Sequence, residues 1–174
     1  MSARGECETY FTCLPLHYYL ARHSNVELDT VKILVEECPR SLMNEGHCHP
    51  IHVILGNPKI CELQNVLKFL LKYQPSSIRF LDKYDRSPLN MACSNPNVNL
   101  DVVRLLLNAW PEATRQRDNC EYDEMTGYLP IHNLCRNEDM DDVTAKDILH
   151  LLIDSDLQSV RERDTYEEFL PIHH

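Results

Sequence analysis

The stretch Leu129-Pro130-Ile131-His132 decides the fold, because close copies of it recur along the chain. The copies are LPLH at 14–17, HPIH at 49–52, SPLN at 87–90 and LPIH at 170–173. Successive prolines of this motif are 35, 38, 42 and 41 residues apart. Such a period is typical of stacked repeat proteins, whose units bury their apolar faces against one another. We therefore expect function on a surface rather than in a catalytic pocket.

Each copy of the motif predicts the start of a helix pair. The proline suits the first turn of a helix because it has no N–H to lose. The second helix carries apolar residues at i, i+3 and i+4, which form one helical face. These residues are Val31, Leu34 and Val35; Leu67, Leu70 and Leu71; Val103, Leu106 and Leu107; and Ile148, Leu151 and Leu152. The second helices are expected to stop at Pro39, Pro75 and Pro111, and at Asp156 in the fourth unit.

These motifs resemble ankyrin repeats. That family has a Thr-Pro-Leu-His start, two small buried residues, a Val-Val-x-Leu-Leu-Leu second helix and an Asp-rich β-turn finger. The third unit matches best, through Ser87-Pro88-Leu89, Ala92-Cys93, residues 102–107 and Arg117-Asp118. Only Ser87 keeps a capping hydroxyl at the threonine position, so we expect a divergent stack. The resemblance implies that the motif's polar residues join adjacent units by hydrogen bonds, namely His17, His52, Asn90, His132 and His173.

We therefore predict an all-α fold, a helical repeat solenoid of about four ankyrin-like helix-turn-helix pairs. The expected organisation is an N-terminal segment (1–13), repeats at 14–48, 49–86, 87–128 and 129–169, and the truncated start of a fifth repeat at 170–174. A tetratricopeptide array, with its fixed period of about 34 residues, is the structural alternative. Neither terminal unit has an obvious polar cap. We expect either a fragment of a longer array or self-association through the uncapped C-terminal repeat.

Charge and hydropathy narrow the class of partner. Residues 101–174 hold 17 acids and 7 bases, and so carry the whole net charge of −10. This acidic half either aids solubility or docks a basic partner. Nucleic acid is not expected, because phosphate binding needs a basic stripe. No apolar stretch approaches the roughly 18 residues of a membrane span, so we expect no membrane partner and a cytoplasmic, or alternatively nuclear, location.

We predict no enzyme and no cofactor. The motif histidines recur once per unit, whereas an active site needs a single constellation. The best metal candidate is a cluster of imidazoles and thiols: His47, Cys48, His49, His52 and Cys61. Adjacent residues in a tight turn point in different directions, which disfavours a zinc site. A metal- or redox-responsive repeat protein using the cluster of His47, Cys48 and His49 is the alternative function.

The expected function is a protein–protein interaction module, or scaffold, that binds through its concave face and inter-repeat fingers. The connectors before each motif place aromatic residues beside acids, and tyrosine is enriched at interface hot spots. The alternative is that each tyrosine packs against its own finger. The predicted partner-binding residues are Tyr18, Met91, Asn133, Tyr84, Tyr122, Asp123, Glu124, Tyr128, Tyr166 and Glu167. We expect a protein partner with a basic segment that meets the acidic connectors at 117–128 and 163–169.

Overall fold

The structure is a computed structural model that describes residues 15–42, 49–60, 62–119, 127–165 and 168–173. Within these ranges the chain forms α-helices and short 3₁₀ helices, and no β-strand. The α-helices are α1 (Pro15–Arg22), α2 (Leu28–Glu37), α3 (Pro50–Leu55), α4 (Leu63–Tyr73), α5 (Pro88–Ser94), α6 (Leu100–Ala109), α7 (Pro130–Cys135) and α8 (Asp142–Ser155). The 3₁₀ helices are η1 (Pro39–Leu42), η2 (Pro75–Arg79), η3 (Pro111–Arg115), η4 (Leu157–Arg161) and η5 (Pro171–His173).

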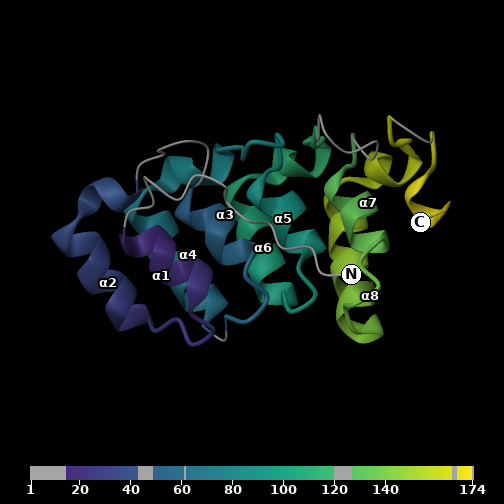
Figure 1. The fold of residues 1–174 in the computed structure, drawn as a ribbon. Helices are drawn as coiled ribbons and strands as arrows, with labels where there is room; N and C mark the ends of the chain where they lie inside the picture. Colours follow the sequence, from purple (N-terminus) through teal and green to yellow (C-terminus); the bar gives the residue numbers. More distant parts are fainter. Residues whose placement is uncertain (1–14, 43–48, 61, 120–126, 166–167, 174) are drawn as a thin grey trace.

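The α-helices pack in two layers that run along the molecule (Figure 1). In the first layer α1, α3, α5 and α7 contact one another in chain order, and in the second layer α2, α4, α6 and α8 do the same. Each helix of the first layer also packs against the helix that follows it, which gives four helix pairs. The all-helical prediction is therefore confirmed, with every helix packed against its neighbours.

The motif proline begins all four helices of the first layer, as predicted. The N-terminal backbone groups of these helices are satisfied in two ways. At α5, the hydroxyl of Ser87 accepts a hydrogen bond from the N–H of Asn90 at 3.2 Å. At α7, where leucine stands at the capping position, the N–H of Leu129 donates to Nδ1 of His132 at 3.2 Å. At α7 the motif histidine thus accepts from the N–H of the capping residue where the capping hydroxyl is missing, whereas no side-chain cap is made at the start of α3.

The core lies between the two layers and is continuous. Leu67, Val103 and Ile148, from three helices of the second layer, are each 0% exposed and lie in one apolar cluster with the first-layer leucines and isoleucines. Leu34, Leu71 and Leu151 are only partly buried, so the predicted apolar stripe is wider than the fully buried part of each helix. None of the α-helices in the described ranges is long and apolar enough to cross a bilayer.

The end of α8 differs from the prediction by one residue. The residues that follow α2, α4, α6 and α8 are Cys38, Gln74, Trp110 and Asp156, and all four have φ between −134° and −152°. The prolines begin η1, η2 and η3 one residue later, and Leu157 takes that place in η4. Asp156 was expected at the proline position and instead caps η4, because its carboxylate accepts from the N–H of Gln158 at 3.1 Å.

Candidate functional site on the finger side

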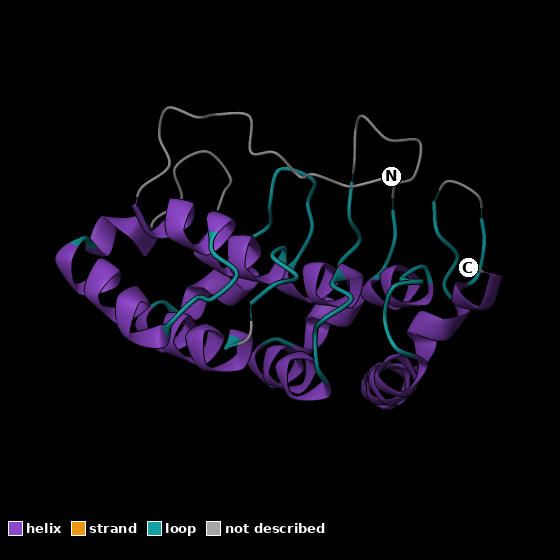
Figure 2. Cartoon of the chain, turned by 60° about the horizontal axis from the view of Figure 1, so that its bottom comes forward, coloured by secondary structure: helices purple, strands orange, loops and turns teal. Residues whose placement is uncertain are grey.

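Three connectors project from the same side of the helical layers (Figure 2). Each runs from a 3₁₀ helix to the next helix that begins at a motif proline, which is α5, α7 or η5. We call them finger 2 (80–87), finger 3 (116–129) and finger 4 (162–170). Residues 120–126 and 166–167 lie outside the described part of fingers 3 and 4.

The bases of the three fingers are built in the same way. A buried aspartate pairs with the residue that stands two positions before the motif proline: Asp82 with Arg86, Asp118 with Tyr128, and Asp164 with Phe169. In each pair the aspartate N–H donates to the backbone carbonyl of its partner, at 3.1, 3.1 and 2.9 Å respectively. The partner's N–H donates back to the aspartate carboxylate at 2.9, 2.7 and 3.1 Å. Two hydrogen bonds therefore close every finger at its base, whatever its length.

The carboxylates at these bases differ in how their charge is balanced. Arg86 donates to the Asp82 carboxylate from Nε at 2.8 Å and from Nη2 at 2.7 Å. Asp118 accepts only neutral donors, the N–H of Tyr128 at 2.7 Å and the side-chain amide of Asn133 at 3.3 Å. Burial raises the pKa of Asp118, and these hydrogen bonds offset only part of that rise. Asn133, predicted to face a partner, therefore helps to hold finger 3.

Two of the motif's polar side chains bind the finger that leads from their own helix pair to the next pair. Nε2 of His52 lies 3.0 Å from the carbonyl oxygen of Arg86. Nδ2 of Asn90 donates to the carbonyl oxygens of Gln116 at 3.2 Å and Tyr128 at 3.3 Å. Burial lowers the pKa of His52, so its neutral ring is the form that donates here. By the predicted repeat bounds each of these bonds lies within one repeat, so the hydrogen bonding between units that the family resemblance implied stays a prediction.

Neighbouring fingers are also joined to each other. The N–H of Asn119 in finger 3 donates to the carbonyl oxygen of Tyr84 in finger 2 at 2.7 Å, and its side-chain amide donates to Asp85 at 3.3 Å. The guanidinium of Arg117 donates to Gly127 O within finger 3 at 2.6 Å, and it links fingers 3 and 4 through two acceptors, Arg163 O at 2.9 Å and Glu162 Oε2 at 3.2 Å. The fingers therefore form one connected row rather than three independent loops.

Besides Asn133, two of the predicted residues lie on helices of the first layer. Tyr18 of α1 is 59% exposed, with the guanidinium carbon of Arg22 5.8 Å from its ring centroid. Met91 of α5 is half-buried, and its methyl group lies over Gly56, where an added Cβ would come within 2.8 Å of it. Tyr18 thus offers most of its ring to solvent, whereas Met91 partly fills the space above the end of α3.

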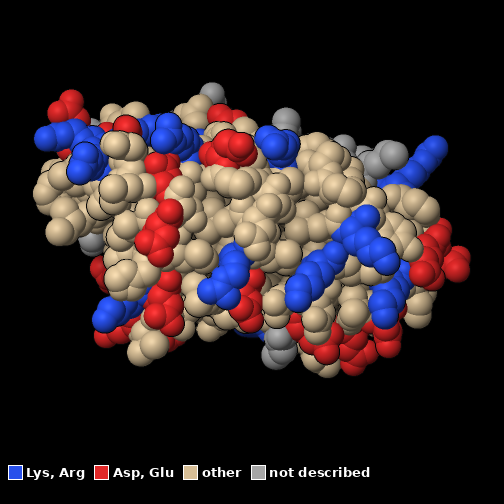
Figure 3. Space-filling view, turned by 180° about the vertical axis from the view of Figure 1, so that it is seen from behind, with Lys and Arg blue, Asp and Glu red and all other residues tan. Residues whose placement is uncertain are grey.

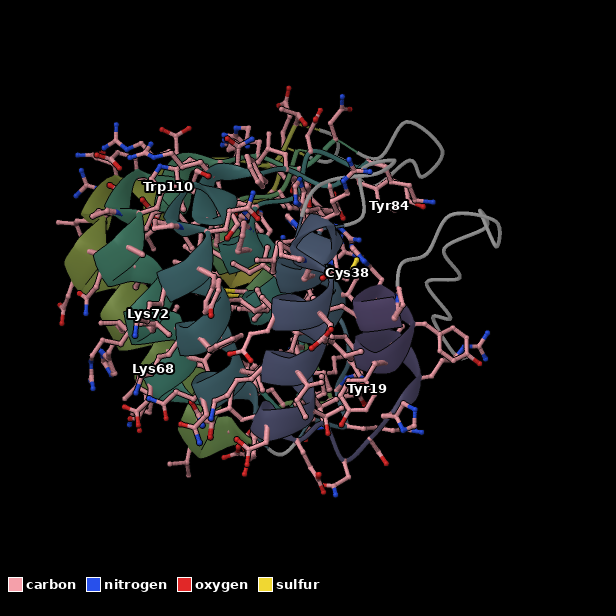
Figure 4. The ribbon with its side chains drawn as sticks, turned by 90° about the vertical axis from the view of Figure 1, so that its left-hand side faces the viewer. Tyr19, Cys38, Lys68, Lys72, Tyr84 and Trp110 are labelled. Atoms are coloured by element: carbon pink, nitrogen blue, oxygen red, sulfur yellow. The ribbon has the colours of Figure 1, made fainter. Side chains whose placement is uncertain are left out.

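Tyr84 lies in finger 2 and is half-buried. Two cations flank its ring, with Lys83 Nζ 4.7 Å and Arg86 Cζ 5.0 Å from the ring centroid. Figure 4 shows Tyr84 on the opposite side of the molecule from Lys68 and Lys72, which belong to the second layer.

Tyr128 does not face solvent as the partner-binding prediction requires. Its side chain is 3% exposed, and its ring lies 6.0 Å from the His132 ring and 4.4 Å from the guanidinium carbon of Arg136. Packing at the base of finger 3 explains this burial, so the alternative reading of the finger tyrosines holds for this residue. The remaining predicted residues lie outside the described residues: Tyr122, Asp123, Glu124, Tyr166 and Glu167.

The histidine and cysteine cluster is described only in part. His47, Cys48 and Cys61 lie outside the described residues. The ring of His49 is buried and stacks on Phe80 with centroids 4.1 Å apart, and His52 is engaged by a backbone carbonyl of finger 2. In the part of the chain that the structure describes, no three His, Cys, Asp or Glu side chains are grouped to hold a metal ion.

The sequence analysis missed a row of asparagines at the other end of the first-layer helices. Asn57, Asn95 and Asn137 each stand seven residues after a motif proline. Each donates from Nδ2 to a backbone carbonyl five residues after the preceding motif proline: Leu20 at 2.8 Å, Leu55 at 2.7 Å and Cys93 at 3.0 Å. We call these residues the asparagine ladder. Their constant distance from the motif is a sequence signal that would have identified them.

The outer face of the second layer has a different character from the fingers. Figure 3 shows Lys and Arg side chains interspersed with Asp and Glu on this face.

No protein-family model matches the chain, and no curated protein is significantly similar to it. The finger side, with its connected row of loops and partly exposed aromatic rings, is therefore the candidate functional site on geometry alone.

Proposed function

We propose that this chain is an ankyrin-like helical solenoid that acts as a protein–protein interaction module. The observation that carries the proposal is the connected row of fingers. Each of these fingers is closed at its base by a buried aspartate that is hydrogen-bonded to the residue two positions before the motif proline. A row of loops held in fixed relative positions offers a partner an extended, pre-organised surface, which reduces the ordering cost of binding.

The ankyrin-like part of the proposal draws support from the local construction. Four helices begin at the motif proline, and His52 and Asn90 donate to backbone carbonyls of the finger that leads to the following pair. Helices of the same layer contact one another in chain order, as expected when each unit buries its apolar face against its neighbours. The concave, finger-bearing side is then the proposed binding face.

The proposed partner carries a basic segment. Connectors 117–128 and 163–169 together hold seven acids and two arginines. Both arginines are engaged within the fingers, Arg117 with Glu162 and two carbonyls and Arg163 with the carbonyl of Glu168. The excess of acids favours Lys and Arg on the partner, and such attraction increases the association rate and weakens with salt.

Tyr18 and Tyr84 are the proposed aromatic contacts in the described residues. Tyr18 is largely exposed, and Tyr84 lies where finger 2 meets finger 3. Tyrosine suits this role because it combines a large apolar ring with a polar tip at low entropic cost. Tyr128 is not included, because its side chain is buried.

The experiment that tests the proposal is affinity capture from the native cell with three forms of the chain. The finger variant is Tyr122→Ala, Asp123→Asn and Glu124→Gln. A matched control makes the same three kinds of change at exposed positions of the second layer: Tyr73→Ala, Asp147→Asn and Asp154→Asn. We expect the wild type and the control to recover a partner that the finger variant loses, and the binding to weaken as salt rises. Equal recovery by the finger variant would place the binding surface elsewhere.

A further inference from the structure

Helix α4, in the middle of the second layer, carries no acidic residue. Its charged residues are Lys68 and Lys72, and both are exposed. The other helices of the second layer, α2, α6 and α8, each contain at least one aspartate or glutamate. The first acid after α4 is Asp82, which is buried and paired with Arg86. In a chain with a net charge of −10, residues 63–81 therefore form a basic segment with three bases and no acid.

Equivalent positions in the other helices show what is different about Lys68. Counted back from the first residue of the following 3₁₀ helix, Lys68 corresponds to a basic residue in α2 and in α6. Each of those residues pairs with an acid three positions earlier: Lys32 with Asp29 at 2.7 Å, and Arg104 with Asp101 at 3.5 Å. In α4 the position of that acid is occupied by Asn65, so Lys68 has no partner within its own helix.

Lys72 adds a second positive charge one helical turn later. At its position α2 has Glu36 and α8 has Asp154. Among the described residues neither Lys68 nor Lys72 forms an ion pair. Two like charges at i and i+4 repel each other, so these charges do not stabilise the helix. An anion bound from outside the chain would relieve their repulsion.

Arg79, at the end of η2, extends this basic segment towards α6. Its guanidinium carbon lies 5.4 Å from the ring centroid of Trp110, which directly follows α6. Arg115 and Arg161 end η3 and η4 in the same way, and Arg115 donates to the carboxylate of Asp156 at 2.8 and 3.2 Å. Among the described residues the guanidinium of Arg79 has the aromatic ring in place of such a carboxylate. A guanidinium held against a ring keeps its N–H groups available for a carboxylate, which it can bind with two parallel hydrogen bonds.

We call Lys68, Lys72, Arg79 and Trp110 the basic strip. Figure 4 shows Lys68, Lys72 and Trp110 on the side of the molecule opposite Tyr84, so the strip faces away from the fingers. Helix α4 contacts both η2 and α6, so the elements that carry the strip are adjacent. They belong to the second and third helix pairs, each of which has a neighbouring pair on both sides.

The acids around the basic strip limit the width of an anionic partner. Exposed acids lie on the elements to either side of α4: Glu36 of α2, Glu112 of η3 and Asp154 of α8. A membrane surface or a nucleic-acid duplex would press its phosphates against these acids as well as against the strip. A single extended polypeptide is narrower than one helix, and it can follow the strip without covering its acidic neighbours.

We infer that the basic strip binds an acidic, Asp- and Glu-rich segment of a partner protein. Lys68 and Lys72 are one turn apart, about 6 Å along the helix axis. Side chains on one face of an extended chain are about 6.6 Å apart, so acids at alternate positions match the two lysines. Arg79 binds a further carboxylate, and the exposed ring of Tyr73 beside Lys72 supplies apolar contact. This surface is separate from the fingers, and the inference does not depend on the proposed function.

Binding of a fluorescein-labelled peptide of alternating Glu and Ser, followed by its anisotropy, tests this inference. We expect saturable binding that weakens as salt rises, and no binding of the same peptide with Gln in place of Glu. The peptide should also change the fluorescence of Trp110, the single tryptophan of the chain. The double variant Lys68→Gln and Lys72→Gln should weaken binding at least about tenfold. Both lysines are exposed, so circular dichroism should show unchanged helix content.

A matched control removes two positive charges elsewhere on the chain. Lys146→Gln with Arg161→Gln changes two exposed residues outside the basic strip and should bind the Glu peptide as the wild type does. The finger variant, Tyr122→Ala with Asp123→Asn and Glu124→Gln, should also bind this peptide normally, which separates this test from that of the proposed function.

Three results would overturn the inference. The first is a wild type that does not bind the Glu peptide even at low salt. The second is a loss of binding that is equal in the Lys68 and Lys72 double variant and in the control. The third is tighter binding of a single-stranded thymidine oligonucleotide, or of vesicles that contain phosphatidylserine, than of the peptide at the same salt concentration, since the strip would then select phosphates.

Discussion

The two ends of the first-layer helices differ in how much they vary. At one end the asparagine ladder repeats the same bond at the same distance from the motif: Asn57, Asn95 and Asn137. At the other end the fingers share a base, but the residues between the paired positions number three in finger 2 and nine in finger 3. The asparagine ladder fixes how the helix pairs stack, whereas the fingers can differ in charge and in length. This difference points to the finger side for recognition.

The largest effect on stability is expected from replacing Asn95, the middle residue of the asparagine ladder. Asn95 is 5% exposed, donates to Leu55 O at 2.7 Å and accepts from the N–H of Asn97 at 2.9 Å. Asn95→Ala leaves the buried carbonyl of Leu55 without this donor and also removes the acceptor of the Asn97 N–H, and should lower the free energy of unfolding by about 2–3 kcal/mol. Urea unfolding followed by the fluorescence of the single tryptophan, Trp110, measures this loss.

The finger side supplies the control for that prediction. Asn119→Ala removes the exposed contact of finger 3 with Asp85 and should cost no more than about 1 kcal/mol. If both substitutions cost the same, the ladder would have no special part in stacking.

Low pH should weaken the hydrogen bond between His52 and the Arg86 carbonyl, but not the equivalent hydrogen bonds of Asn90. Burial lowers the pKa of His52, so below the unfolded value of about 6.5 the unfolded chain binds a proton more readily than the folded chain. The contribution of His52 is therefore fully present above that pH and is lost as pH falls towards the folded pKa. His52→Asn, which copies Asn90, should flatten this part of the pH dependence in urea unfolding. An unchanged slope would show that His52 does not govern it.

A smaller effect is expected at the ion pair between Arg115 and Asp156. Arg115 is 70% exposed, so Arg115→Ala should cost about 1 kcal/mol or less at neutral pH. Hydrogen bonding from Arg115 lowers the pKa of Asp156. The contribution is thus present above the unfolded value of about 3.9 and is lost as pH falls through the folded pKa. Arg161→Ala, at the equivalent position, where the described residues show no ion pair, should leave the free energy of unfolding unchanged at neutral and at acidic pH, and an equal loss there would contradict this account.

The smallest effect on stability is expected at the turn of finger 2. Asp85 has φ of 54° and is exposed, and asparagine tolerates this left-handed conformation as well as aspartate does. Asp85→Asn should therefore change the free energy of unfolding by no more than about 0.5 kcal/mol. The same variant should bind a basic partner more weakly, with a reduced dependence of affinity on salt. A large loss of stability would mean that the finger tips, and not only their bases, hold the fold.

The parts of the fold that the sequence predicted are those tied to the motif by a fixed distance. The motif proline begins the first-layer helices because its ring suits the first helical turn wherever it occurs. His52 and Asn90 were expected to form hydrogen bonds, and both donate to a backbone carbonyl. The asparagine ladder is also at a fixed distance from the motif, and it was overlooked because asparagine in a loop is usually only a turn former.

The candidate site was harder to predict because its geometry depends on how each finger returns to the layer. Asp82 and Asp118 stand at different distances from the following motif proline. Both nevertheless stand seven residues after the proline that begins the preceding 3₁₀ helix, Pro75 and Pro111, and the sequence analysis did not use this spacing. Tyr128 lies on the returning side of finger 3, where the fold buries its ring against His132 and Arg136. From the sequence, an aromatic residue beside acids is predicted to be exposed. Whether it is buried depends on the path that the chain takes in the folded structure.

The most direct test of the central claim is amide hydrogen exchange of the chain alone and in complex with the partner that it captures. The account predicts slower exchange in the complex for finger 2, the described ends of fingers 3 and 4, and the starts of the first-layer helices. It predicts no change in the turns that hold the asparagine ladder. Protection confined to the outer face of α4, α6 and α8, with the fingers unchanged, would contradict the claim that the finger side is the recognition surface.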